Sequence, residues 1–388
     1  MSDDFAGKIL QALDQRPPHE LLDVLAEHLP TVVGTSRLWL ADYEEATLEP
    51  LDFAEGGRQP STSVDGPGAG RAFREQQPVI EEIAAGGVET GVSLHLPVTM
   101  RAERIGVLEV VLAERPDARQ VDRLAMAATA VAYTVTAARR YTDTFELARR
   151  RRELELPAEM QWELLPVLAH DGPDFRLAGS VEPAYDIGGD NFDYSVEVSG
   201  VAFSLSDAMG HGTRAAMLSN LAVAAQRNAR RHGDSLRQQV RAVNTAVHDS
   251  FGGEMFITGV FLQVERRTGR GWVVNAGHSL FWRLRGDQIA HVAVPPDLPA
   301  GLFAQTEYTA HPFEMAEGDR ILLASDGVIE ATDPEGEQYG TDRLRAHLLA
   351  CANDPPTEVV RRLTTAVKDH ARGHLADDAT ALCVDYRR

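Results

Sequence analysis

The sequence predicts an α+β protein with an α/β domain in its N-terminal part and a strand-rich domain in its C-terminal part. Helical periodicity and short strands are mixed before residue 167, whereas many strand-like segments follow that point and enclose two long helices. The length agrees with more than one domain, because 388 residues with 44% apolar content suffice for roughly two or three cores.

The N-terminal domain is predicted to contain helices around a small antiparallel sheet. Helical periodicity marks its first segment, which Pro17 and Pro18 interrupt, and the turn before the last strand is placed at Glu103 and Arg104. A stretch rich in Gly, Pro and Ser is predicted to be loop. The predicted elements are helices over 5–29 and 72–76, strands over 37–40, 91–99 and 104–112, and a loop over 55–70.

The longest helical signal covers residues 117–156. Its apolar residues recur at spacings of three and four and form a stripe of Leu124, Ala128, Val131, Val135, Ala138 and Phe145. The stripe can pack on the domain's own sheet or on a second copy, and we expect it to form a parallel homodimer. Pro157 is expected to end this helix and to begin another over 158–165.

The C-terminal domain is predicted to be an antiparallel β-sandwich with helices outside. Its strands are predicted at 176–182, 193–198, 201–205, 256–263, 272–275, 279–285, 320–324 and 380–385, and its helices at 214–230 and 235–251. Residues at the strand ends are candidates for a shared site at one edge of the two sheets.

Acidic residues gather at the ends of four of these strands. Asp190, Asp207 and Asp326 lie near glycines, and Asp377 is followed directly by Asp378. Carboxylate and carbonyl oxygens are the ligands that Mg²⁺ and Mn²⁺ prefer. For Asp207 alone, the alternative is a strand-turn-helix corner in which the carboxylate caps the helix. The four clusters together favour a carboxylate-lined metal centre.

Charge and composition exclude several classes of function. A net charge of −20 and a pI near 5.1 argue against binding to nucleic acid or to an anionic membrane, since both need basic patches. No signal peptide and no run of about 18 apolar residues is found, so we expect a cytoplasmic protein. Cys351 and Cys383 are too few for a disulfide framework or a zinc site.

Five motifs resemble those of the metal-dependent (PPM, type-2C-like) serine/threonine protein phosphatases, in particular the bacterial SpoIIE-like branch. They are Gly188-Gly-Asp-Asn-Phe-Asp193, Ser206-Asp-Ala-Met-Gly-His-Gly212, Asn275-Ala-Gly-His278, Ala324-Ser-Asp-Gly-Val-Ile-Glu330 and Asp377-Asp-Ala-Thr380. The resemblance covers about residues 167–388. It implies hydrolysis of phosphoserine or phosphothreonine by metal-activated water, on a partner expected to be a phosphorylated anti-sigma factor antagonist.

The resemblance also implies roles for individual residues. Asp190, Asp207, Asp326 and Asp377 correspond to catalytic carboxylates that hold two ions, Mn²⁺ or Mg²⁺. In this family pattern Asp207 bridges both ions with help from the Ala208 carbonyl. Asp190 completes one ion site, and Asp326 and Asp377 complete the other.

Four further polar residues have roles that the sequence leaves open. Asp378 and Asp193 either bind metal or orient a ligand. His211 and His278 are candidate acids for the leaving serine oxygen, or they are structural. The intact acidic motifs favour an enzyme, and the alternative is a non-catalytic interaction protein that binds its partner through a phosphatase-like body.

Residues 96–109, with the helix that follows them, resemble part of a GAF sensor domain. The resemblance implies a sensor over 1–140 and a helical linker over 141–166, which couples the sensor to a phosphatase domain over 167–388. A GAF domain holds a small-molecule ligand or serves only in dimerisation and coupling, and both alternatives stay open. No cysteine precedes Cys351, so a thioether-linked chromophore is excluded there.

Overall fold

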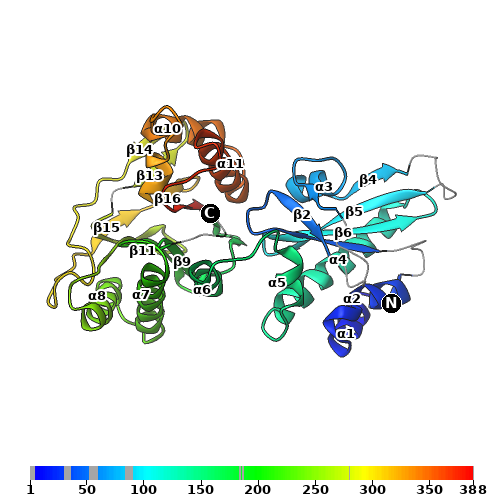
Figure 1. Cartoon of the computed structure of the whole chain (residues 1–388), viewed down its shortest axis with the longest axis horizontal. Coiled ribbons are helices and arrows are strands. Elements are labelled where there is room, and N and C mark those ends of the chain that lie inside the picture. The colour runs from blue at the N-terminus through cyan, green and yellow to red at the C-terminus, as the bar shows by residue number, and fades with distance from the viewer. Residues whose placement is uncertain are drawn as a thin grey trace. The chain divides into compact units, whose positions relative to one another are not determined.

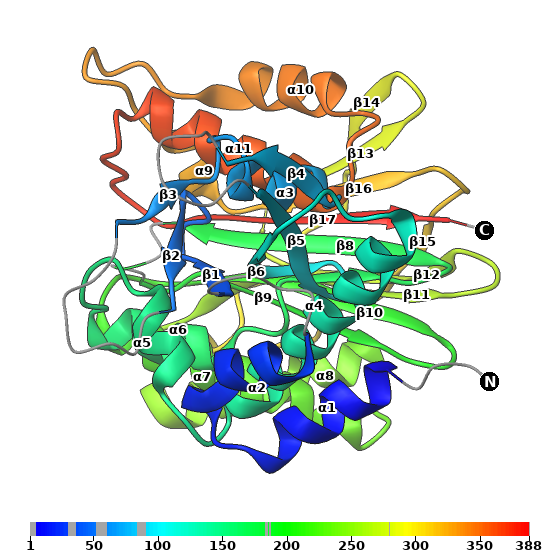
Figure 2. The ribbon, with the colours of Figure 1, turned by 90° about the vertical axis from the view of Figure 1, so that its right-hand side faces the viewer.

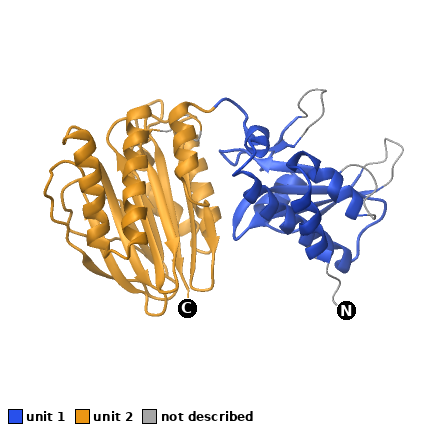
Figure 3. Cartoon of the chain, turned by 90° about the horizontal axis from the view of Figure 1, so that it is seen from below, with its two compact units in different colours: residues 1–153 blue, residues 154–388 orange. Residues whose placement is uncertain are grey.

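The computed structural model of the chain describes residues 5–29, 36–51, 60–83, 91–182, 185, 188–278 and 280–387. The chain divides into two compact units, Met1–Glu153 and Leu154–Arg388 (Figure 3). Helix α5 (Thr144–Arg149) belongs to the first unit and α6 (Leu156–Leu164) to the second, so the two units share the predicted linker. Part of the predicted loop over 55–70 and the first residue of the predicted strand over 279–285 lie outside the described residues.

The N-terminal unit contains a six-stranded antiparallel sheet in the order β3-β2-β1-β6-β5-β4 (Figure 1). The strands are β1 (Arg37–Ala41), β2 (Thr47–Pro50), β3 (Thr62–Ser63), β4 (Val79–Glu82), β5 (Val92–Met100) and β6 (Glu103–Leu112). The helices before α5 are α1 (Phe5–Gln15), the 3₁₀ turn η1 (Pro18–Glu20), α2 (Leu21–His28), α3 (Ala69–Glu75) and α4 (Ala118–Ala138).

Both faces of this sheet are covered, because successive side chains of a strand point to opposite faces. Leu94 and Leu96 of β5 join a buried core with α1, α2 and α4, whereas Trp39 and Val107 lie in a second core with α3. The turn between β5 and β6 lies at Arg101–Ala102, earlier than predicted. Neither residue is Gly, Asn or Asp, which are typical of turns, so the sequence did not indicate a turn at this position.

The single long helix predicted over residues 117–156 is wrong. α4 begins with a capping box of Asp117 and Gln120 and ends at Ala138, and α5 starts only at Thr144. Every residue of the predicted stripe from Leu124 to Phe145 is buried in the core of the N-terminal unit. These side chains are already covered, so the stripe does not support the predicted homodimer.

The C-terminal unit agrees with the predicted sandwich of antiparallel sheets. One sheet has the order β15-β12-β11-β10-β9 and the other β14-β13-β16-β17-β8-β7. The strands are β7 (Ala169–Asp171), β8 (Phe175–Glu182), β9 (Asn191–Val196), β10 (Gly200–Ala208), β11 (Ile257–Glu265), β12 (Arg270–Ala276), β13 (Phe281–Arg285), β14 (Gln288–His291), β15 (His311–Glu314), β16 (Arg320–Ala324) and β17 (Ala379–Tyr386).

An apolar core lies between the two sheets and fixes their ends. Leu205 and Leu262 from the first sheet meet Leu323 and Leu382 from the second. The helices are α6, α7 (Thr213–Arg231), α8 (Leu236–Phe251), α9 (Asp326–Glu330), α10 (Gly340–Ala350) and α11 (Pro356–His370). α7 and α8 cover the outer face of the first sheet, and α11 packs on β8 and β17, which run side by side in Figure 2.

Among the described residues, no helix is both long enough and apolar enough to span a lipid bilayer.

We predict that Phe145→Ala destabilises the N-terminal unit. Its ring is 0% exposed, and removal of a buried phenylalanine ring costs about 3–5 kcal/mol in a typical core. Urea unfolding of the full chain, followed by circular dichroism, measures the change. Tyr133→Ala is the control, because Tyr133 lies 46% exposed on α4 and its loss should cost less than about 1 kcal/mol. Coincident unfolding curves for Phe145→Ala and the wild type would contradict the packing of α5 on this unit.

Candidate metal centre

In the first sheet, β9 and β10 bring Asp190 and Asp207 to the same end. The two strands are antiparallel and Ser206 lies opposite Asn191, so the next pair along the register is Asp207 with Asp190. Asp190 is only 2% exposed, and its Oδ2 atom is buried without a hydrogen-bond partner. A buried, unsatisfied carboxylate oxygen is costly, which favours a ligand at this position.

Glycines allow the backbone to approach closely around Asp207. Gly210 and Gly212 have positive φ values of 92° and 73°, which let the chain turn from β10 into α7. A Cβ atom on Gly189 would lie 2.5 Å from the carbonyl oxygen of Ala208. Only glycine therefore fits at position 189, beside the carbonyl that the sequence analysis assigned to metal binding.

In the second sheet, Asp326, Asp377 and Asp378 lie at the neighbouring ends of β16 and β17. Asp326 begins α9 directly after β16, and the Asp377-Asp378 pair precedes β17. Ser325 fixes the two strand ends, because its hydroxyl accepts from the Thr380 N–H at 2.9 Å and donates to the Asp378 carbonyl at 3.1 Å. Asp326 and Asp377 are exposed, whereas Asp378 is buried.

Asp378 ties the second sheet to the first. Its Oδ2 atom accepts hydrogen bonds from the backbone N–H groups of Gly188 and Gly189 at 2.8 Å and from that of Asp190 at 3.3 Å. These bonds join residues far apart in the sequence and hold the segment that leads into β9 against the start of β17. They bring Asp190 to the carboxylates of the second sheet.

The carboxylates lie within electrostatic reach of one another. Burial, followed by the charges of Asp326, Asp377 and Asp378, raises the pKa of Asp207 from 3.8 to about 7. Burial and the charges of Asp207 and Asp378 raise the pKa of Asp190 well above its ordinary value. Burial raises the pKa of Asp378 as well, although the N–H groups of residues 188–190 oppose this. The charges of three other carboxylates raise the pKa of Asp207, whereas those of two raise the pKa of Asp190.

The chemistry of these residues suits a hard cation. Across the described part of the chain, no group of three or more His, Cys, Asp or Glu side chains is gathered as a ready metal site. The unpartnered Oδ2 of Asp190 and a donor set made only of oxygens fit Mg²⁺ or Mn²⁺.

Asp193 lies away from this cluster, in ion pairs with two arginines of α7. Its carboxylate is 2.8 Å from Arg227 Nη2 and 2.9 Å from Arg230 Nη1. Arg227 Nη2 also donates to the Leu164 carbonyl of α6 at 2.8 Å. The sequence did not indicate a role for Arg227, because a helical pattern gives no sign of its ion pair with Asp193, 34 residues earlier.

The two candidate histidines occupy different environments. His211 is exposed in the turn between β10 and α7. His278 is buried, its Nε2 lies 2.7 Å from the carbonyl oxygen of Ala324, and burial lowers the pKa of its imidazole. Because this nitrogen is engaged by a buried carbonyl, His278 is not placed to protonate a leaving group.

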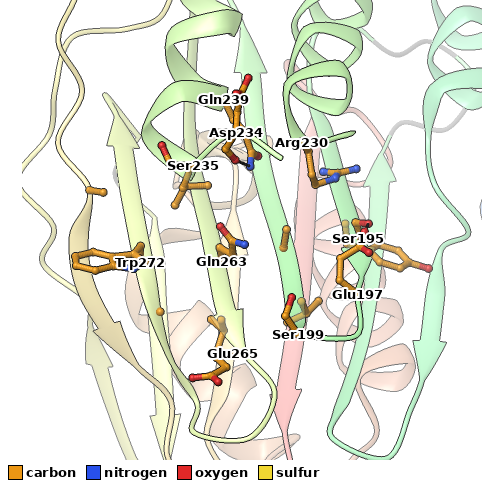
Figure 4. Close-up of a pocket in the computed structure, with 18 of the residues that line it drawn as sticks. Ser195, Glu197, Ser199, Arg230, Asp234, Ser235, Gln239, Gln263, Glu265 and Trp272 are labelled. Atoms are coloured by element: carbon orange, nitrogen blue, oxygen red, sulfur yellow. Dashed lines mark hydrogen bonds between the residues drawn. The ribbon is translucent and has the colours of Figure 1, made fainter. Parts of the chain in front are cut away.

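A groove of about 1700 Å³ opens on the outer face of the first sheet, near the start of β10. In Figure 4, Trp272 and Gln263 lie across its floor, Arg230 and Asp234 lie on the side of the helix ends, and Glu265 lies opposite. Its lining includes none of the carboxylates discussed above except Asp193. The groove and the carboxylate cluster are therefore separate features of the described structure.

The fold of the C-terminal unit is similar to that of a solved phosphatase domain. The SiaA-PP2C domain of Pseudomonas aeruginosa matches with a TM-score of 0.51 and 19% sequence identity, over 60% of this chain and 94% of that domain. The C-terminal unit thus has the PP2C class of fold.

Sequence comparison finds a similarity to one family model. Residues 197–387 match the family model described as Stage II sporulation protein E (SpoIIE). Phosphoserine phosphatase RsbP of Bacillus subtilis (strain 168) is 24% identical over 61% of this chain, and phosphoserine phosphatase RsbU of the same organism is 22% identical over 48%. The matches span 58% and 56% of those two proteins, less than two thirds of either. The matched residues, 197–387, lie within the C-terminal unit, which is therefore similar to this family in sequence.

We predict that the metal-free protein loses stability as the pH rises through about 7. The raised pKa of Asp207 means that the folded state binds more protons than the unfolded state between pH 3.8 and about 7. The stabilisation from this group is fully present below about pH 4 and is lost as the pH passes about 7, on the order of a few kcal/mol. Asp207→Asn should flatten the decline, since it keeps the shape without the charge.

Urea unfolding with a chelator present, from about pH 5 to about pH 8, measures the free energy of unfolding of the wild type and of Asp207→Asn. Asp287→Asn serves as the control, because Asp287 lies exposed in the turn between β13 and β14. Equally steep declines for Asp207→Asn and the wild type would contradict the crowding of charge around Asp207.

Proposed function

We propose that the chain is a metal-dependent phosphoprotein phosphatase that hydrolyses phosphoserine or phosphothreonine on a partner protein. The crowding of carboxylates around Asp207 is the observation that supports this most. Hydrolysis of phosphate monoesters is among the slowest uncatalysed reactions, so an enzyme without a covalent nucleophile needs concentrated positive charge. Crowded carboxylates with an unpartnered buried oxygen are suited to hold that charge as metal ions.

In this proposal Asp207 and the Ala208 carbonyl would help to hold two Mn²⁺ or Mg²⁺ ions. Asp190 completes one ion site from the buried side, and the exposed Asp326 and Asp377 complete the other from the open side. The metal, when bound, activates water and neutralises the phosphoryl oxygens. The chain's own residues hold the ions at an open edge of the sandwich, where a phosphate carried on a protein can reach them.

Asp378 has a positioning role in this proposal. Three backbone N–H groups already occupy its Oδ2 atom. Asp377 Oδ1 accepts the N–H of its neighbour Asp378 at 2.9 Å and, among the described residues, no other hydrogen bond. Asp378 therefore holds the segment that carries Asp190, and Asp377 is the member of the pair that binds metal.

The proposed substrate is a phosphorylated anti-sigma factor antagonist in a partner-switching cascade. The names of the relatives RsbP and RsbU, both phosphoserine phosphatases, support a phosphoserine substrate. The chain itself has a net charge of −20, which repels phosphate in general. Binding of the substrate phosphate therefore depends on the local charge of the metal ions.

The N-terminal unit is proposed to be a GAF-type sensor that regulates the phosphatase, with or without a small-molecule ligand. Regulation would reach the C-terminal unit through α6. Arg227 joins the end of α6 to Asp193 of β9, and Asp190 directly precedes that strand. A shift of α6 would therefore move the backbone that positions Asp190.

A non-catalytic interaction protein is the second candidate function. It is favoured by the lack of a tightly gathered ligand group among the described residues. Hydrolysis of p-nitrophenyl phosphate by the full chain, with and without Mn²⁺, separates the two candidates, because only a phosphatase hydrolyses this compound.

We predict that Asp207→Asn nearly abolishes Mn²⁺-dependent turnover of p-nitrophenyl phosphate and leaves the fold intact. The variant keeps the shape of a shared ligand and removes its charge. Asp326→Asn and Asp377→Asn should raise the Mn²⁺ concentration needed for half-maximal activity. Substantial turnover by Asp207→Asn at saturating Mn²⁺ would refute the shared-ligand role. If Asp378→Asn raises this Mn²⁺ concentration more than Asp377→Asn does, Asp378 is the metal ligand and Asp377 has the positioning role.

We predict that Arg227→Ala changes the Mn²⁺ requirement of the full chain by about 5–150-fold, the range of a typical coupling between sites. The variant removes the contacts to Leu164 and Asp193. Arg231→Ala is the matched control, because Arg231 lies on the same helix and is exposed. Mn²⁺ titration of turnover measures both variants, and identical curves for them would argue against coupling through Arg227.

A further inference from the structure

The segment Asn275–His278 forms a rigid turn at the end of β12. The Asn275 side chain accepts the His278 N–H at 2.8 Å and donates to the Val294 carbonyl at 3.0 Å. Gly277 has a φ of 84°, and a Cβ atom there would lie 3.2 Å from the Pro299 ring. The backbone of His278, from which its ring extends, is therefore held in place.

The His278 side chain reaches from the first sheet to the second. Its Nε2 lies 2.7 Å from the carbonyl oxygen of Ala324, the last residue of β16. A carbonyl can only accept, so Nε2 carries the proton. His278 is 7% exposed and Ala324 is 0% exposed, so this hydrogen bond is shielded from water.

This hydrogen bond lies where regular strand pairing has ended. On the side of β17, the Ser325 N–H donates to the Thr380 carbonyl at 2.9 Å. On the side of β13, the ladder ends at the pair Phe281 and Leu323, after which the Ala324 N–H donates to the Leu280 carbonyl at 3.2 Å. Among the described residues, His278 is the donor to the buried Ala324 carbonyl.

We infer that His278 is a positioning residue that fixes the backbone of Ala324 and thereby places the carboxylate of Asp326. The inference rests on the proposed function, because it takes Asp326 to be a metal ligand. Asp326 follows Ala324 by two residues, and its charge interacts electrostatically with the imidazole of His278. His278 itself touches neither metal nor substrate in this arrangement. Groups that hold a metal ligand in place typically change metal affinity by about 10–100-fold when removed.

The experiment compares His278→Leu with His278→Gln in the full chain. Leucine fills space without a donor, whereas the amide nitrogen of glutamine reaches about as far as Nε2 and can donate to Ala324. His232→Leu is the matched control, since His232 also lies 2.8 Å from a backbone carbonyl, that of Asn228, but is exposed at the end of α7. Mn²⁺ binding is measured without substrate, by the electron paramagnetic resonance signal of free Mn²⁺, alongside turnover of p-nitrophenyl phosphate.

We expect His278→Leu to bind Mn²⁺ about 10–100-fold more weakly and to recover most of its turnover at saturating Mn²⁺. His278→Gln and His232→Leu should bind within about threefold of the wild type. If His278→Leu does not fold, His278→Asn replaces it, because asparagine is too short to reach Ala324. The inference is overturned if His278→Leu, or His278→Asn in its place, binds Mn²⁺ as tightly as the wild type. It is also overturned if His278→Gln binds Mn²⁺ as weakly as His278→Leu. A wild-type chain that binds no Mn²⁺ overturns the proposed function and this inference with it.

Discussion

Repulsion among like charges at one edge of a β-sandwich is the constraint on which the C-terminal unit depends. The pKa of Asp207 rises to about 7 because of burial and the charges of three other carboxylates, those of Asp326, Asp377 and Asp378. Such crowding costs stability, and sites that accept the cost are typically sites of function. The fold opposes the repulsion with directed hydrogen bonds, above all those from the backbone of residues 188–190 to Asp378. These bonds keep Asp190 close to the like charges of Asp207 and Asp378, which repel it.

The rest of the sandwich provides rigid positions for these groups. Each cluster lies at the end of a strand whose interior residues are locked in the core, such as Leu205 two residues before Asp207 and Leu323 shortly before Asp326. Local ties then fix the strand ends across the edge: Ser325 joins β16 to β17, and His278 joins β12 to β16. Chemistry that needs several oxygens in defined places can be built this way, because strands and core residues move little.

Local sequence signals predicted the parts of the site that depend on short stretches of chain. An alternating strand, an aspartate and two glycines placed Asp207 at a strand end, and the structure has it there. The prediction of one long helix failed because the apolar spacing continues past Ala138, and periodicity cannot show that the helix ends there. Helices α10 and α11 were not predicted, and the short β7, β14 and β15 carry too few residues for a pattern. Contacts between distant segments, such as Asp378 with Gly188 or Arg227 with Asp193, have no local signature at all.

The central claim is that these strand ends hold divalent metal around Asp207. The most direct measurement is anomalous diffraction from crystals of the full chain grown with Mn²⁺, recorded on both sides of the manganese absorption edge. The account predicts manganese peaks beside Asp207, one also ligated by Asp190 and the other by Asp326 and Asp377. Crystals whose manganese peaks all lie away from these carboxylates, or that show none in the presence of saturating Mn²⁺, would contradict it.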